Sequence, residues 1–243
     1  KCKHCEFKND NESDLKSGFE ECWESIYLDF NPNEPHIFDI WNFRKSEKLI
    51  NQDVIYQKDL YEGVLVNDLN PRQLLQVEKT VNRSNTEDVK LELFTEMESW
   101  EFPYHFIDFE TSMVAIPFYK GRHPYEQIAF QISCHTLYED GSIEHVEWIE
   151  TEQGKFPNYD FVKALKDVLD KDNGAIFRYA AHENSVLRQI QKQMIDDNEE
   201  QYGEWIEWID TITEWEDGDT GEEFKAERNM VDMLKLVRDY YYH

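Results

Sequence analysis

The spacing of apolar side chains separates a helical first part of the chain from a second part in which strands and helices alternate. Around residues 19–27, 71–77 and 89–97, apolar side chains recur at intervals of three or four positions, which predicts amphipathic helices. Asn70-Pro71 marks the start of the second of these helices. Residues 1–100 hold no pattern typical of a catalytic site, so we expect this helical segment to serve as a packing or scaffolding arm.

From residue 101 the chain changes character, because aromatic and β-branched residues replace the helical spacing. Residues 104–111 favour a strand, and residues 126–137 alternate apolar and polar side chains as a half-buried strand does. Asp140-Gly141 is a hairpin turn signal that leads into a third strand. The elements expected after it are a helix over residues 161–169, a buried strand over 174–179, a helix from 186 and a closing helix over 230–242.

This order of elements predicts a mixed α/β core, in which a three-strand meander is followed by right-handed β-α-β crossovers. The order matches the ribonuclease H-like architecture. We therefore divide the chain into a helical, cysteine-bearing N-terminal segment, residues 1–100, and a ribonuclease H-like domain, residues 101–243.

The balance of charge is strongly acidic and limits the functions that the chain can have. It contains 25 Lys and Arg against 52 Asp and Glu, a formal net charge of −27, which excludes broad capture of nucleic acid by a basic surface. Fourteen of the acidic residues lie in residues 196–227 beside a single basic residue, Lys225. Trp205, Trp208 and Ile209 predict a helix inside this acidic insertion, and we expect the remainder to be solvated. No apolar stretch approaches the length of a membrane span, so no membrane partner is expected.

The four cysteines are too few for a secreted disulfide scaffold of this size, so we expect a reducing, cytoplasmic location. Cys2 and Cys5 form a C-x₂-C pair and Cys22 follows, a set that suits Zn²⁺ or an iron–sulfur cluster. His4 or a residue upstream of the sequence would supply the fourth ligand. The alternative is that these are ordinary thiols, as we expect for Cys134, which lies in an apolar run typical of a protein core.

Asp108 and Glu110 are the strongest candidates for chemistry. They lie two positions apart on the first predicted strand of the α/β domain, so both side chains should point to the same face of the sheet. Two carboxylates held close together repel one another unless a cation lies between them, and the hard cations Mg²⁺ and Mn²⁺ prefer oxygen ligands. Paired ions of this kind activate a water molecule and stabilise the leaving oxygen in phosphodiester cleavage.

A third carboxylate, Glu183, falls where the predicted fourth strand turns into a helix, at the carboxyl end where open sheets place their ligands. Glu183 could complete a metal cage with Asp108 and Glu110, and His182 could carry a proton. The alternative for Glu183 is a first-turn carboxylate stabilised by the helix dipole, and for His182 an ordinary surface histidine.

Two further features could contact a substrate. The loop Lys120-Gly121-Arg122-His123 is a small basic patch in a very acidic chain, and it suits a phosphate group. Gln131 shares a strand face with Gln127 and His135 and could line a substrate groove. Polar residues on the solvent face of a strand explain the same pattern equally well.

The Asp108-x-Glu110 strand, the strand-to-helix Glu183 and the order of the strands resemble the DnaQ-like (DEDD) 3′–5′ exonuclease superfamily. The wider pattern is similar to an uncharacterised bacterial family assigned to that superfamily. That pattern lies in residues 105–111, 115–117, 124–127, 130–133 and 179–184. The resemblance implies a metal-dependent nuclease in which Asp108, Glu110 and Glu183 bind Mg²⁺ or Mn²⁺ and act on single-stranded DNA or RNA.

Residues 1–23 are similar to the cysteine-bearing tail of a CRISPR-associated type of nuclease, which implies an upstream nuclease module as a partner. The superfamily usually has Asp where Glu183 stands, and its last motif has no evident counterpart before His243. We therefore expect a C-terminally truncated domain with an incomplete site, a state in which the isolated chain could lack activity. The alternatives are a non-catalytic binding or scaffold module of a larger nucleic-acid-processing protein, and an acidic mimic of nucleic acid.

Overall fold

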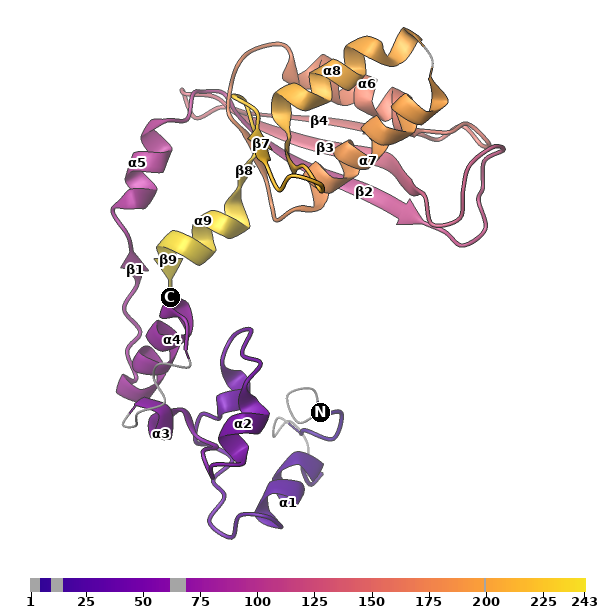
Figure 1. Ribbon diagram of the computed structural model, residues 1–243. Helices are drawn as coiled ribbons and strands as arrows, with labels where there is room; N and C mark the ends of the chain where they lie inside the picture. Colours follow the sequence, from indigo (N-terminus) through magenta and orange to yellow (C-terminus); the bar gives the residue numbers. More distant parts are fainter. Residues whose placement is uncertain (1–4, 10–14, 62–68, 199) are drawn as a thin grey trace. The chain divides into compact units, whose positions relative to one another are not determined.

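The structure, a computed structural model, describes residues 5–9, 15–61, 69–198 and 200–243. Contacts within the chain divide it into two compact units, residues Lys1–Glu87 with His243, and residues Asp88–Tyr242 (Figure 1). The boundary expected at residue 100 falls earlier, because strand β1 (Asp88–Val89) pairs with strand β9 (Tyr241–Tyr242) and attaches the residues around it to the second unit.

The first unit consists of short helices around an aromatic core. Its helices are α1 (Gly18–Glu24), α2 (Ser46–Ile50), α3 (Gln57–Tyr61) and α4 (Pro71–Asn82), with a 3-10 turn at Ile37–Asp39. The rings of Phe19, Trp23 and Phe30 are buried, with centroids 6.1–6.3 Å apart. Asn70 caps α4 by accepting a hydrogen bond from the Gln73 amide over 2.9 Å, so this helix begins where the sequence predicts.

The second unit contains a five-stranded mixed sheet with the strand order β4-β3-β2-β5-β8. Its strands are β2 (Tyr104–Met113), β3 (Gln127–Leu137), β4 (Ile143–Ile149), β5 (Ile176–Arg178) and β8 (Val231–Asp232). The β2, β3 and β4 strands form the predicted antiparallel meander, whereas β5 and β8 run parallel to β2. The sequence predicted a mixed α/β core, and the structure confirms it.

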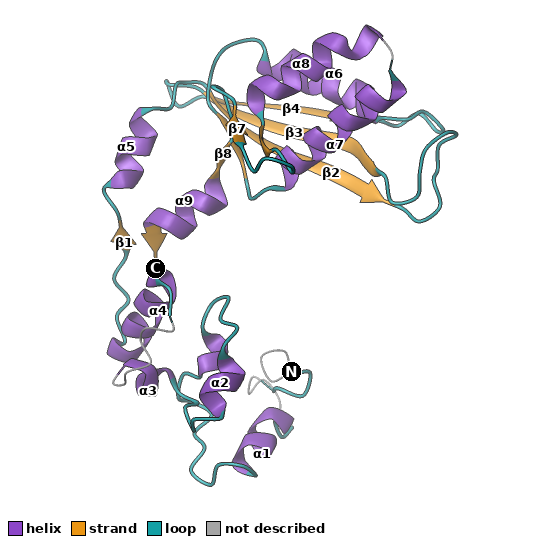
Figure 2. Ribbon diagram, in the orientation of Figure 1, coloured by secondary structure: helices purple, strands orange, loops and turns teal. Residues whose placement is uncertain are grey.

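Helices cover one face of this sheet, as Figure 2 shows. They are α6 (Asn158–Leu169), α7 (His182–Asp197) and α8 (Gly203–Ile212). Each turns an apolar stripe inward, such as Phe161, Leu165 and Leu169 of α6, onto the buried side chains of β2 and β3. Burial of these stripes is the main source of stability for the unit.

The rest of the second unit differs in part from the sequence prediction. The acidic insertion contains the expected helix α8, and residues 214–225 are largely exposed to solvent, as predicted. They form a hairpin of β6 (Glu214–Glu216) and β7 (Glu223–Lys225), which the sequence did not predict. The rings of Trp215 and Phe224 lie 5.5 Å apart across this hairpin, which explains the pairing. The other helices are α5 (Glu92–Glu98) and α9 (Met233–Tyr240), each shorter than predicted because neighbouring residues join strands. No helix in the described ranges is long and apolar enough to cross a membrane.

Candidate functional site

Strand β2 carries the first two candidate residues on its uncovered face. Ile107 and Phe109 are buried against the helices, whereas Asp108 and Glu110, which alternate with them, are exposed. The carboxylates lie opposite Ser133 and Gln131 of β3. The prediction that Asp108 and Glu110 share one face is therefore confirmed, and that face is the one without the layer of α6, α7 and α8.

The parallel neighbour of β2 ends before it reaches these carboxylates. Strand β5 pairs with β2 only at His105 and Phe106, after which the chain turns into α7. Beyond Phe106, that edge of β2 has no strand partner among the described residues. Asp108 and Glu110 therefore lie beside an open sheet edge, where the start of α7 can approach them.

Glu183, in the first turn of α7, points toward the core, and one of its carboxylate oxygens makes no hydrogen bond within the described residues. Its side chain belongs to the same helix stripe as Leu187, Ile190 and Met194, and Glu183 is only 4% exposed. Its Oε2 atom has no hydrogen-bond partner among the described residues. Burial is the main cause that raises the pKa of this carboxyl, and the Asp108 carboxylate raises it further. A hydrogen bond from the Glu183 backbone amide, His182 and Arg178 act in the opposite direction. Glu183 and Asp108 are thus close enough to influence one another electrostatically.

The turn that leads from β5 into α7 is held in an unusual conformation. Ala180 has a φ of 66°, a left-handed backbone conformation that is unfavourable for residues with a side chain. Its amide donates to Asp232 over 3.2 Å, and its carbonyl accepts a hydrogen bond from the Arg178 guanidinium. His182 is exposed, and its Nε2 lies 3.3 Å from the Thr111 hydroxyl of β2. These contacts fix where α7 begins, and therefore where Glu183 lies.

Arg178 was not among the residues predicted from the sequence, although its contacts make it the centre of this turn. Arg178 is 2% exposed and donates to Glu214 over 2.7 Å and to Asp232 over 3.1 Å. The sequence did contain a signal for Arg178, because it is a charged residue inside the otherwise apolar run that forms β5. Its partners could not be identified because they lie far away along the sequence.

The residues present fit a hard divalent cation by their chemistry, although they do not form a complete cage by themselves. Among the described residues, no group of three or more His, Cys, Asp or Glu side chains lies close enough to hold a metal ion. Mg²⁺ is commonly bound through only one or two carboxylates, with water and substrate phosphate as its other ligands. Asp108, Glu110 and the unpartnered Oε2 of Glu183 supply oxygen donors of this kind.

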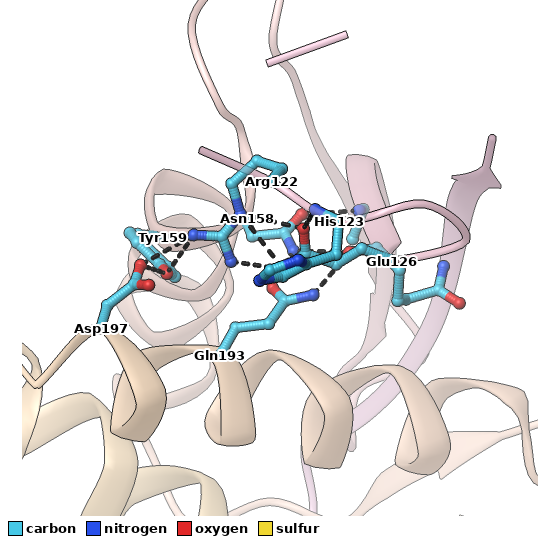
Figure 3. A network of polar contacts seen from close by, with 9 residues as sticks. Arg122, His123, Glu126, Asn158, Tyr159, Gln193 and Asp197 are labelled. Atoms are coloured by element: carbon cyan, nitrogen blue, oxygen red, sulfur yellow. Dashed lines mark hydrogen bonds and ion pairs between the residues drawn. The ribbon is translucent and has the colours of Figure 1, made fainter. Parts of the chain in front are cut away.

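The predicted substrate contact at Arg122 has another role in the structure. The Arg122 guanidinium donates to both carboxylate oxygens of Glu126 and, over 2.8 Å, to Asp197 at the end of α7, as Figure 3 shows. It also lies 4.2 Å from the centroid of the Phe156 ring. Because its charge is compensated and its side chain is largely buried, Arg122 serves to anchor the loop and is not available to a phosphate.

The other two predicted substrate contacts lie where a ligand can reach them. Lys120 is exposed on the loop between β2 and β3. Gln131 is half-buried opposite Glu110, on the uncovered face of the sheet. Gln131 therefore lies beside the candidate carboxylate Glu110, whereas Arg122 anchors the loop.

Only two of the three cysteines predicted to bind a metal lie in the part of the chain that the structure describes. Cys2 lies outside the described residues. Cys5 is half-buried and Cys22 is exposed on α1, and both are free thiols. Cys134 is buried in the core, as predicted. The metal proposed for Cys2, Cys5 and Cys22 stays a prediction.

The second unit is therefore a mixed α/β domain with helices on one face of its sheet and carboxylates on the other. The sequence profile of the family described as "Domain of unknown function (DUF2779)" matches residues 105–243, and the chain belongs to this family. The match begins one residue after the start of β2 and includes all three candidate carboxylates. No curated protein and no solved structure matches the chain.

Proposed function

We propose that the second unit is a metal-dependent nuclease domain with a ribonuclease H-like fold, of the DnaQ-like type. It would hydrolyse phosphodiester bonds of single-stranded DNA or RNA from the 3′ end, with Mg²⁺ or Mn²⁺ as its cofactor. The observation that carries the proposal is the pair Asp108 and Glu110, which share the uncovered face of β2 beside the edge that β5 leaves open. The start of α7, which bears Glu183, lies beside this strand, because His182 contacts Thr111 of β2.

The topology of the sheet supports the fold assignment. A three-strand antiparallel meander is followed by two parallel strands, and the first strand of the meander lies at the centre of the sheet. This is the arrangement that the ribonuclease H-like prediction requires. The order of the strands along the chain also reverses between β2 and β5, and ligands in open α/β sheets bind at such topological switch points.

The residues have distinct roles in the proposed reaction. Asp108, Glu110 and Glu183 would hold the metal, which would supply Lewis-acid activation of water and of the leaving oxygen. Gln131, beside Glu110, would contact the substrate backbone. Asp232 and Arg178 would act only by positioning, since they hold the turn that precedes Glu183.

The proposal is tested by incubating the chain with end-labelled single-stranded DNA and RNA in Mg²⁺ or Mn²⁺. We expect shortening from the 3′ end, and a loss of rate of at least about 100-fold in Asp108→Asn, which keeps the shape of the side chain but removes its charge. Glu147→Gln is the matched control, because Glu147 is an exposed carboxylate on the same face, on β4. Equal rates for the wild type and Asp108→Asn would reject the nuclease assignment.

A binding or scaffold module without catalysis is the second candidate function. The observation that favours it is the lack of a three-ligand group among the described residues, together with the net charge of −27. Calorimetry with Mn²⁺ separates the two functions. The nuclease is supported if the wild type releases heat on binding Mn²⁺ and the triple variant Asp108→Asn, Glu110→Gln, Glu183→Gln does not. Equal heats of Mn²⁺ binding for the wild type and the triple variant support the scaffold.

A further inference from the structure

The loop that joins β2 to β3, residues 114–126, exposes an unusual amount of apolar surface. Ile116 is 81% exposed, Phe118 is 70% exposed and Tyr125 is 64% exposed. Figure 1 shows that this loop continues past the arrowhead of β2. It leaves β2 after Met113, so it starts about 10–13 Å along the chain from Glu110, at the end of the strand that carries the candidate carboxylates.

The base of the loop is held firmly although its apolar side chains face solvent. The Tyr125 amide donates to the Val114 carbonyl over 2.8 Å and closes the loop. Arg122 binds Glu126 within the loop and Asp197 on α7. Tyr125 has a φ of 58°, a strained conformation for an aromatic residue. An anchored loop loses little conformational entropy when a ligand binds to it, which favours a role in binding.

The charge of the loop differs from that of the rest of the chain. Arg122 and Glu126 compensate one another, so the remaining ionisable groups that can face a ligand are Lys120 and His123. In a protein with a net charge of −27, the exposed Lys120 is a cation on the same loop as the exposed rings, and it is suited to contact a phosphate. A flat aromatic ring next to a cation is the usual combination for binding an unpaired base and its phosphate.

We propose that the 114–126 loop is a stacking platform for unpaired nucleotide bases, with Phe118 and Tyr125 as the stacking rings and Lys120 as a phosphate contact. The inference deepens the proposed function and rests on it, because it supplies the means by which an acidic chain holds a single strand beside its carboxylates. Stacking depends little on the net charge of the protein. The binding energy would therefore come from the bases and only to a small extent from the phosphates.

The test measures the fluorescence anisotropy of short labelled strands of oligothymidylate and oligouridylate, with the full chain in Ca²⁺, a hard cation that carboxylates accept. We expect Phe118→Ala and Tyr125→Ala each to weaken binding about 5- to 100-fold, the range of one lost stacking contact. Phe118→Trp keeps the ring and should keep the affinity. Ile143→Ala is the matched control, since Ile143 is 69% exposed at the other end of β3 and β4 and should not change binding.

Two further measurements distinguish stacking from charge. An oligonucleotide backbone with abasic sites should bind much more weakly than oligothymidylate. The logarithm of the binding constant should fall with the logarithm of salt concentration with a slope of about −0.7, as expected for one phosphate contact to a single strand. Wild-type affinity in Phe118→Ala, equal binding of the abasic strand, or no binding by the wild type would each overturn the inference.

Failure of this inference and failure of the proposed function give different results. A wild-type chain that does not cleave in Mn²⁺ but binds oligothymidylate through Phe118 removes the nuclease and leaves the platform. A chain that cleaves in an Asp108-dependent way but binds equally well after Phe118→Ala removes the platform and leaves the nuclease.

Discussion

The guanidinium of Arg178 donates a hydrogen bond to the carboxylate of Asp232 over 3.1 Å, linking β5 to the residue that caps α9. The other oxygen of Asp232 accepts hydrogen bonds from the amides of Ala180 and Lys235. One carboxylate thus holds a buried arginine, the strained turn before α7 and the first turn of α9. Through the turn at Ala180, Asp232 also determines where Glu183 lies.

We expect Asp232→Ala to lower the free energy of unfolding by about 2–3 kcal/mol, because it leaves the buried Arg178 with Glu214 as its only remaining acidic partner among the described residues. Urea denaturation followed by tryptophan fluorescence measures the change. Asp239→Ala is the matched control, since the Asp239–Arg238 pair is exposed and should contribute no more than about 0.5 kcal/mol. Similar losses in both variants would contradict a special role for Asp232.

Replacement of Glu183 should have the opposite effect to replacement of Asp232, because it should stabilise the fold at neutral pH. Burial and the Asp108 carboxylate raise the pKa of Glu183 above its ordinary value of 4.5. The folded state therefore binds the proton more tightly than the unfolded state, so stability contributed by this group is lost as the pH rises from about 4.5 through the raised pKa.

We expect Glu183→Gln to unfold at a higher urea concentration than the wild type at pH 7, and at the same concentration at pH 4. Denaturation curves at both pH values, without divalent metal, check this. Glu200→Gln, in the exposed 3-10 turn Glu200–Tyr202 after α7, is the control and should show no difference at either pH. A Glu183→Gln protein that is less stable than the wild type at pH 7 would mean that the carboxylate is compensated in solution.

The sequence predicted the elements of the second unit well where their patterns are local. The alternation of Ile128, Ile132 and Cys134 with polar residues identified β3, and the same period of two placed Asp108 and Glu110 on one face. The short strands β1 and β9 were missed because two residues are too few to show any period. Their pairing depends on contacts between opposite ends of the second unit.

The candidate site was predicted less completely than the fold because its supporting contacts are non-local. Asp197, which neutralises Arg122, is 75 residues away in sequence, and Asp232, which holds Arg178, is 54 residues away. A sequence pattern shows which residues are charged but not which opposite charges meet. Arg122 therefore resembled a free phosphate ligand, and only its contacts with Glu126 and Asp197 show that it is a structural anchor.

This anchoring role predicts that Arg122 contributes much more to stability than an exposed cation does. We expect Arg122→Ala to lower the free energy of unfolding by about 2–3 kcal/mol, because it leaves Glu126 and Asp197 without their cation and removes the contact with the Phe156 ring. Lys163→Ala is the control, since its pair with Asp167 is exposed on α6 and should contribute less than about 0.5 kcal/mol. Hydrogen exchange should also become faster in residues 114–126 of Arg122→Ala, and unchanged exchange there would contradict the anchor.

The start of β5 is positioned by a close backbone approach that allows no side chain. A Cβ atom built on Gly174 would lie 1.9 Å from the carbonyl oxygen of Pro103, so one of the two backbone segments would have to move. Hydrogen bonds on either side oppose this movement, since the Ala175 amide donates to Glu101 over 2.9 Å and the His105 amide donates to Ala175 over 2.8 Å. The register between β2 and β5, and with it the approach of α7 to β2, depends on this contact.

We therefore expect Gly174→Ala to lower the free energy of unfolding by about 2–3 kcal/mol, as overpacking against an immobile backbone does. Gly203→Ala is the matched control, because a Cβ atom there meets no described atom within 4 Å and lies at the start of α8. That variant should be as stable as the wild type or more stable by up to about 0.5 kcal/mol. Urea denaturation of both variants measures the difference. Equal stabilities would show that the segments around Pro103 and Gly174 can separate freely, in which case the β2–β5 register could not fix the distance between Asp108 and Glu183.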